Sequence, residues 1–216
     1  MTMLNELEAK QLFHQYGIRV NDGIGVHTPA EAADAAEKLG FPVAVKVLSR
    51  QITHKSDLGL VALDVRTADC ARGACDRILA TARKIDADAY AVVEPMAPDG
   101  VAEVIIGGKR DPQFGPTVLF GLGGIFVEVF KDVSLRVAPV NHSIALKMIQ
   151  EIKGYTILKG FRGKQGADVD ALAYMIMSVS RIMMTREDVL ELDANPVIAY
   201  EKGAVAVDAR VLLKDD

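Results

Sequence analysis

The chain has 216 residues, of which 50% are hydrophobic and 25% charged, and its net charge is −4. This composition is typical of a globular protein, and the length allows one sizeable core or two lobes around a shared cleft. The acidic balance and the lack of a Lys/Arg run argue against nucleic acid as a partner. No apolar run is long enough to span a membrane, and residues 1–10 are charged and amphipathic, unlike a signal peptide.

The two cysteines indicate a reducing compartment. Cys70 and Cys75 lie five residues apart in a stretch with helical periodicity, and they form neither a CxxC site nor a disulfide framework. Because disulfides accumulate in oxidising compartments, we expect a cytoplasmic protein.

The first half of the chain predicts an alternation of helices and extended segments. The second helix has a marked start, with Thr28 as N-cap, Pro29 in the first turn and Glu31 as capping-box partner. Residues 94–100 contain two prolines and a glycine, and we expect a hinge between two lobes there. We expect helices over residues 4–16, 29–39 and 67–84, and extended segments over residues 18–26, 41–47, 58–65 and 90–93.

The second half predicts more strands than helices. Neither a G-x-G-x-x-G after the first strand nor a G-x-x-x-x-G-K-[ST] is present, so neither a Rossmann nor a P-loop fold is favoured. We expect turns at Gly107–Gly108 and at Asn195–Pro196, and a polar, Gly-rich loop over residues 153–166. We expect strands over residues 102–106, 116–120, 133–137, 189–192 and 204–207, and helices over residues 141–152 and 168–184.

Lys46 is the first candidate for a functional side chain. It lies inside the apolar strand 41–47, where a lysine is costly unless a negative group meets it. The side chain either reaches solvent from an edge strand or faces a cleft that holds an anion.

The polar loop that follows this strand is the second candidate. Residues 54–59 read His-Lys-Ser-Asp-Leu-Gly, and backbone amides with a Lys and a Ser suit the binding of phosphates. A neutral imidazole such as His54 can also accept a phosphoryl group. The alternative is a solvated turn with a surface histidine, and composition alone favours it.

A group of acidic residues near the end of the chain is the third candidate. Alternation places Glu191, Asp193 and Asn195 on one face of an extended segment, and Asp208 lies beside them if two strands pair as a hairpin. Such hard oxygen ligands suit Mg²⁺. Asn195 before Pro196 is also simply a good turn sequence. The glycines of residues 121–124 either form a plain turn or allow a ligand to approach the backbone.

These motifs stand in the order found in ATP-grasp proteins. Over nearly the whole chain, the sequence resembles the nucleotide-binding subunit of ADP-forming acetyl-CoA synthetases, relatives of succinyl-CoA synthetase. The most specific stretches are residues 52–57 (ITHKSD), 109–116 (KRDPQFGP), 120–128 (FGLGGIFVE) and 193–196 (DANP). The resemblance implies an α+β, ATP-grasp fold with two lobes around a nucleotide cleft. We expect one lobe over residues 18–96 and the other over residues 97–216, with the helix of residues 1–17 packed on the second.

The resemblance also implies roles for particular residues. Lys46 is similar to the lysine that contacts the α- and β-phosphates of ATP, and Lys55 and Gly59 belong to the phosphate-covering loop. Glu94 and Met96 resemble the hinge that meets adenine, Met96 through its backbone, and Glu103 resembles the acid that binds the ribose. Asn195 and Asp208, with Asp193 close by, resemble the Mg²⁺ ligands, and His54 resembles the histidine that relays phosphate. The family usually has a second glycine where this chain has Leu60.

The activity implied is that of an acid–CoA ligase: acyl-CoA, ADP and phosphate give acid, CoA and ATP, reversibly. Coenzyme A binding belongs to a second, α-type subunit or domain in that family, so we expect a hetero-oligomer and no activity of the chain alone. Two other functions remain open. A different ATP-grasp carboxylate ligase would not need His54, and a nucleotide-sensing regulatory module would bind ATP without forming a phosphoenzyme.

Overall fold

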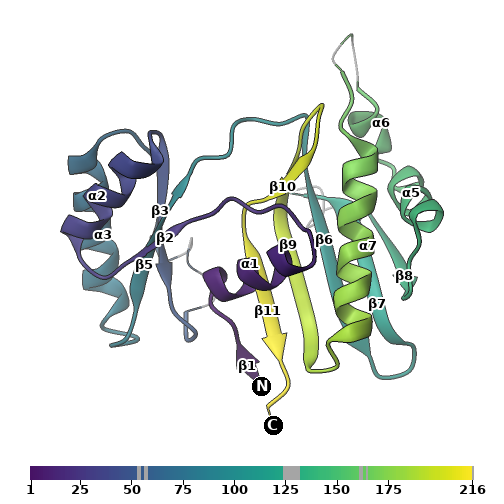
Figure 1. The fold of residues 1–216 in the computed structure, drawn as a ribbon, viewed down its shortest axis with the longest axis horizontal. Coiled ribbons are helices and arrows are strands. Elements are labelled where there is room, and N and C mark those ends of the chain that lie inside the picture. The colour runs from purple at the N-terminus through teal and green to yellow at the C-terminus, as the bar shows by residue number, and fades with distance from the viewer. Residues whose placement is uncertain (53–54, 56–57, 124–131, 161–162, 164, 216) are drawn as a thin grey trace. The chain divides into compact units, whose positions relative to one another are not determined.

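The fold was described from a computed structural model, which covers residues 1–52, 55, 58–123, 132–160, 163, 165–215 (Figure 1). The chain divides into two compact units. Unit 1 combines Met1–Val20 with Asp99–Asp216, and unit 2 consists of Asn21–Pro98. Each unit has its own hydrophobic core, so each is described by itself.

In its described residues, unit 2 is a four-stranded sheet with two helices packed on one face. The strand order is β2-β5-β3-β4, and all described neighbours run antiparallel. Alternate strand residues such as Val45 and Val93 point into a core shared with the helices. The elements are β2 (Ile24–Val26), α2 (Pro29–Leu39), β3 (Val43–Leu48), β4 (Val61–Val65), α3 (Ala68–Ala82) and β5 (Tyr90–Pro95).

Local signals fix where α2 begins and ends. The Thr28 side chain accepts a hydrogen bond from the Glu31 N–H, and Pro29 occupies the first turn, which confirms the predicted start. The Glu31 carboxylate accepts a bond from the His27 N–H, which holds the pKa of Glu31 below its usual value. The helix ends at Gly40, whose φ of 81° is one that favours glycine.

Unit 1 is built on a larger sheet, which has seven strands within the described residues (Figure 1). The strand order is β1-β11-β9-β6-β7-β8, and β10 pairs with β9. The strands are β1 (Thr2–Met3), β6 (Ala102–Asp111), β7 (Gly115–Leu122), β8 (Val133–Val137), β9 (Val189–Ala199), β10 (Ala204–Ala206) and β11 (Ala209–Leu213). The helices are α1 (Glu6–Gln15), α5 (His142–Glu151), α6 (Tyr155–Leu158) and α7 (Val169–Thr185).

The core of unit 1 lies between one face of this sheet and the helices. In the view of Figure 1, α1 and α7 lie in front of the sheet. Phe13 of α1, Ile176 of α7 and Phe120 of β7 are fully buried members of the same cluster. Because strand residues alternate, the intervening side chains project from the opposite face. We call this second surface the face opposite the helices.

The predicted turn at Gly107–Gly108 is wrong, because β6 runs through both glycines. A Cβ at Gly108 would lie 2.7 Å from the Met183 side chain and 3.2 Å from Val179. Gly108 is therefore required by the close approach of α7, not by a turn. The chain turns instead after Asp111, whose carboxylate accepts bonds from the N–H groups of Gln113 and Phe114.

The predicted turn at Asn195–Pro196 is also wrong, since β9 continues to Ala199. On one side, β9 pairs with β11 as far as Ala194 and with β10 from Val197 onward. Pro196 has no N–H group to donate to a neighbouring strand. It lies at the junction between these two pairings, where a missing N–H donor is tolerated. The strand therefore changes partner at this point without turning.

Two further differences concern short elements. The loop expected over residues 153–166 contains the helix α6, and a strand that the periodicity missed, β11, follows β10. No helix among the described residues is long and apolar enough to cross a membrane.

Candidate nucleotide and metal site

Lys46 forms a buried ion pair with Glu94. The two residues lie on neighbouring strands, β3 and β5, on the face of the unit 2 sheet turned away from α2 and α3. The Lys46 Nζ is 2.9 Å from the Glu94 Oε2, and the side chains are 7% and 0% exposed. Of the two positions considered for the Lys46 side chain, the one that reaches solvent is therefore excluded. The lysine faces the interior and meets a negative group there.

Two residues that the sequence analysis missed hold Glu94 in place. The Asn21 side chain donates a hydrogen bond of 3.2 Å to the Glu94 Oε2. A Cβ at Gly23 would lie 2.5 Å from Val92 and 2.7 Å from Glu94, so only glycine lets the chain lie this close to the pair. The sequence Asn-Asp-Gly at residues 21–23 is a typical turn signal, which conceals this role.

The hinge residue Met96 has one of its backbone groups already engaged. Its N–H donates to the Pro42 carbonyl oxygen at 3.0 Å, extending the pairing of β5 with β3 by one bond. A backbone contact between Met96 and adenine would therefore have to use the Met96 carbonyl group.

The loop predicted to cover the phosphates is only partly described. His54 lies outside the described residues. Gly59 has a φ of 67°, and the Leu60 side chain is fully buried in the core of unit 2. The Leu60 N–H donates to the Lys55 carbonyl oxygen, and the Leu60 carbonyl accepts from Val47. Leu60 thus anchors the end of the loop to β3.

The predicted metal ligands come together in unit 1. Asp193 and Asn195 lie on β9, and the Asn195 N–H donates to the Asp208 carbonyl oxygen at 3.3 Å, directly before β11. The Asp208 carboxylate accepts a bond from the Ala209 N–H. Asp193 lies beside Gly107, where a Cβ would be 3.8 Å from the Asp193 Oδ1. The hairpin condition set by the sequence is therefore met.

The electrostatic environment of Asp193 is unusual for a carboxylate. Burial raises its pKa to about 6, and the negative charges of Asp208 and Glu191 act in the same direction. Arg210, which is its register partner on β11, opposes the shift only in part. Asp193 therefore lies where a bound cation would be favourable.

The donor set fits a metal ion that is bound together with a phosphate ligand. Among the described residues, no group of three or more His, Cys, Asp or Glu side chains is placed to hold a metal by itself. Two carboxylates and one amide oxygen are present instead. Mg²⁺ commonly takes one or two carboxylates and completes its octahedron with water and substrate phosphates. The residues at hand therefore match Mg²⁺ with a nucleotide better than a resident metal centre.

Glu103, the candidate for ribose binding, is exposed on β6 of unit 1. Its carbonyl oxygen accepts a bond from the Gly123 N–H at 2.8 Å. A Cβ at Gly123 would lie 3.2 Å from the Glu103 backbone, so the glycine allows these two segments to lie side by side. The Glu103 carboxylate remains accessible to a ligand.

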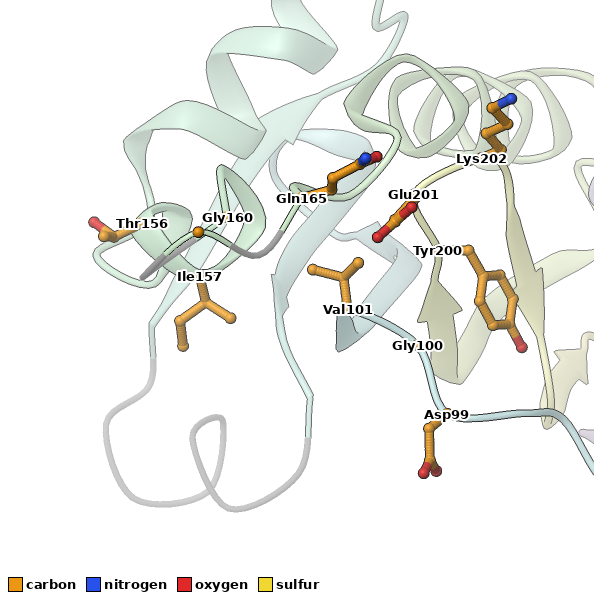
Figure 2. Close-up of a pocket in the computed structure, with 11 residues that line it drawn as sticks. Asp99, Gly100, Val101, Thr156, Ile157, Gly160, Gln165, Tyr200, Glu201 and Lys202 are labelled. Atoms are coloured by element: carbon orange, nitrogen blue, oxygen red, sulfur yellow. The ribbon is translucent and has the colours of Figure 1, made fainter.

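A separate hollow in unit 1 lies near the end of β9 (Figure 2). Its walls come from the segment directly before β6, from α6 with the segment after it, and from the turn between β9 and β10. Side chains that line it include Asp99, Val101, Ile157, Gln165, Tyr200 and Glu201. None of the residues predicted to bind nucleotide or metal is among its described lining residues.

Comparison with known proteins decides the family. The ATP-grasp domain family matches residues 1–213. The β subunit of acetate–CoA ligase [ADP-forming] I from Pyrococcus furiosus is 46% identical over 213 residues, which are 97% of this chain and 91% of that protein. The chain belongs to the ATP-grasp domain family. Within it, the chain belongs with the β subunits of ADP-forming acetate–CoA ligases.

Other relatives of this ATP-grasp chain add two facts. In Archaeoglobus fulgidus, acetate–CoA ligase [ADP-forming] I is 42% identical, and the match covers 97% of this chain but only 31% of that longer protein. The structure of acetyl-coenzyme A synthetase 1 from Ca. Korarchaeum cryptofilum, with coenzyme A and Ca-AMPCP, has a TM-score of 0.93 at 43% identity. The structural match covers 99% of this chain and 94% of the Korarchaeum chain. The ATP-grasp fold expected from the sequence is thereby confirmed.

Proposed function

We propose that this chain is the nucleotide-binding β subunit of an ADP-forming acyl-CoA synthetase. It would act with a coenzyme A-binding α-type subunit to convert acyl-CoA, ADP and phosphate into acid, CoA and ATP. The observation that carries the proposal is the oxygen ligand set of Asp193, Asn195 and Asp208, in which the Asp193 carboxylate lies where a cation would offset its burial.

Lys46 and Glu94 would supply the phosphate-binding part of this function. The pair holds a positive charge in a buried position, so the ammonium group is kept in place before the nucleotide arrives. Phosphoryl transfer depends on positioning and charge neutralisation more than on covalent chemistry by the protein. On binding, Lys46 would share its charge between Glu94 and the phosphates. Mg²⁺ would neutralise further phosphate charge at Asp193, Asn195 and Asp208.

His54 would take part in the phosphoryl relay. It would accept the γ-phosphoryl group of ATP on a ring nitrogen, releasing ADP, or return that group to ADP in the reverse direction. One structure of the Ca. Korarchaeum cryptofilum enzyme holds Mg-AMPPCP, with a phosphohistidine segment pointing towards the nucleotide-binding site. That arrangement supports a relay through histidine in this chain as well.

The test is calorimetric titration of the isolated chain with ADP and ATP, with and without Mg²⁺. We expect Mg²⁺-dependent binding that Lys46→Met and Asp208→Asn each weaken at least about tenfold, which corresponds to about 1.4 kcal/mol. Asp69→Asn, at a carboxylate that is 92% exposed on α3, is the matched control and leaves the affinity unchanged. Binding that neither Mg²⁺ nor Asp208→Asn affects would contradict the proposed metal site.

A second experiment tests the relay. With a coenzyme A-binding subunit present, His54→Gln should abolish ATP formation from acetyl-CoA, ADP and phosphate. The nucleotide affinity of the isolated chain should stay the same. Retained activity would favour a carboxylate ligase that uses no histidine, and an inactive but nucleotide-binding wild type would favour a regulatory module.

A further inference from the structure

Within the part of the chain that the structure describes, strand β8 is the edge of the unit 1 sheet and is packed on only one of its faces. Among the described residues it pairs with β7 alone. On the side of the helices, Ser134 is buried and bonds to Glu151 of α5, and Arg136 forms an ion pair with the same carboxylate. The polar side chains of β8 therefore make their contacts on the side of the helices, with α5 of unit 1.

The other side of β8 exposes only apolar side chains. Val133, Leu135 and Val137 are 40%, 56% and 52% exposed. Leu135 is the register partner of Leu119 on β7, and Val133 is the partner of Gly121. A Cβ at Gly121 would lie 2.8 Å from Val133 and 3.5 Å from Ile105 of β6, so these two side chains close over the glycine. We call the continuous surface of Ile105, Leu119, Val133, Leu135 and Val137 the β8 strip.

An exposed strand edge of this kind is normally protected. Edge strands usually carry a charged side chain or a proline, because their free N–H and C=O groups can pair with another chain. The exposed face of β8 carries neither within residues 133–137. Contiguous apolar surface beside a free edge is typical of a site where another polypeptide adds a strand.

The β8 strip and the proposed metal site both lie on the face opposite the helices. The register places Asp193, Gly107, Leu119 and Leu135 in one row across four neighbouring strands. Three strand spacings separate Asp193 from Leu135, which is about 14 Å. A polypeptide bound to the strip would therefore lie within reach of a nucleotide phosphate at Asp193.

We propose that the β8 strip and the free edge of β8 dock the coenzyme A-binding subunit, through an extended segment with alternating apolar side chains. This inference rests on the proposed function, which requires that subunit to exchange a phosphoryl group at the nucleotide site. The single-chain relative from Archaeoglobus fulgidus supports the choice of occupant, since this chain matches only 31% of its length. In that protein the ATP-grasp part and the remaining two thirds belong to one polypeptide, which keeps them close together.

The experiment measures the affinity of this chain for the companion subunit of the Pyrococcus furiosus acetate–CoA ligase I. Wild type is compared with Leu135→Glu and with Leu135→Thr, which keeps strand propensity while removing apolar surface. The matched control is Tyr174→Glu, at a large side chain that is 61% exposed on α7. Thermal unfolding and Mg·ADP titration of every variant accompany the measurement.

We expect Leu135→Glu to weaken subunit binding at least about tenfold and Leu135→Thr to weaken it less. Tyr174→Glu should bind like wild type, and all variants should bind Mg·ADP equally. Equal affinity of Leu135→Glu and wild type would overturn the proposal. So would wild-type chain that binds no companion subunit, or that self-associates through β8 instead. Loss of Mg·ADP binding by wild type with subunit binding intact would refute the proposed function but not the docking surface.

Discussion

At the residue scale, the pairing of Lys46 with Glu94 is the most consequential contact that the structure adds. A buried ion pair contributes little net stability, because both charges lose their hydration when they are buried. Breaking it by removal of one partner is much costlier, because the remaining charge stays buried and loses its counter-charge. The fold therefore keeps the Lys46 ammonium group in the interior at a cost that Glu94 and Asn21 reduce.

A double-mutant cycle at Lys46 and Glu94 tests this coupling. Glu94→Gln should lower the free energy of unfolding by about 3 kcal/mol, because Lys46 keeps its charge without its partner carboxylate. Adding Lys46→Met should recover at least about 1 kcal/mol of that loss. Urea unfolding without nucleotide measures both values. A double variant that is less stable than Glu94→Gln alone would refute the coupling.

Asp193 gives a prediction for pH dependence. Its pKa is raised to about 6 in the folded chain, so the folded state binds its proton more tightly than the unfolded state does. Ionisation of this group therefore lowers the free energy of unfolding as the pH rises from the ordinary pKa of an aspartate towards 6. The full cost is present above pH 6. Asp193→Asn removes this cost.

We therefore expect the stability advantage of Asp193→Asn over wild type to grow by about 1 kcal/mol from pH 5 to pH 7.5 in the absence of Mg²⁺. Urea titrations at the two pH values check it, with Asp69→Asn as the control. Saturating Mg·ADP should reverse the order, because only wild type keeps the carboxylate that we propose as a Mg²⁺ ligand. An advantage of the variant that is the same at both pH values would refute the pKa shift.

At the scale of elements, the contact of α7 with β6 shows why a glycine pair need not be a turn. Gly107 and Gly108 are adjacent on one strand and point to opposite faces. A Cβ at Gly108 would collide with Met183, whereas a Cβ at Gly107 would have its nearest neighbour, the Leu192 carbonyl oxygen, at 3.5 Å. The two positions therefore form a matched pair for testing the packing of α7.

Gly108→Ala should lower the free energy of unfolding by about 1–3 kcal/mol, because the added methyl group displaces Met183 from a close-packed interface. Gly107→Ala should cost distinctly less, since ordinary van der Waals contacts await its methyl group. Chemical unfolding of the two variants side by side measures the difference. Equal losses would mean that strand propensity, rather than the approach of α7, determines the requirement for glycine.

At the scale of the whole molecule, the chain consists of two units that differ in continuity. Unit 2 is one uninterrupted segment, Asn21–Pro98, with a core formed by α2, α3 and its own sheet. Unit 1 is made of two segments, since α1 with Leu12 and Phe13 completes a core that is otherwise formed after Asp99. A continuous segment with its own core is expected to fold independently.

Residues 21–98, expressed alone, should therefore fold cooperatively. The expected results are dispersed amide signals and a single sigmoidal unfolding transition. Residues 99–216 without residues 1–20 should fail this test, because Leu12 and Phe13 would be missing from the core. A disordered 21–98 fragment would contradict the division of the chain.

The sequence by itself determined the features that depend on neighbours along the chain. The start of α2 follows from Thr28, Pro29 and Glu31, because a helix cap is an interaction over three residues. The order of the motifs indicated the family, which the relatives confirm. The candidate ligands Asp193 and Asn195 could also be placed on one face in advance, since alternation on a strand is a local property. Asp208 joins them only through the pairing of strands.

Only the tertiary structure decided features that depend on elements far apart in the sequence. The glycines at 107 and 108 and the proline at 196 have the composition of turns, yet contacts with α7, β10 and β11 keep them within strands. Whether Lys46 faced solvent or an acid depended on β5, and the apolar exposure of β8 depended on which strand stood at the edge. A residue's type limits what it can contact, but its burial and partners are set by the packing of the whole unit.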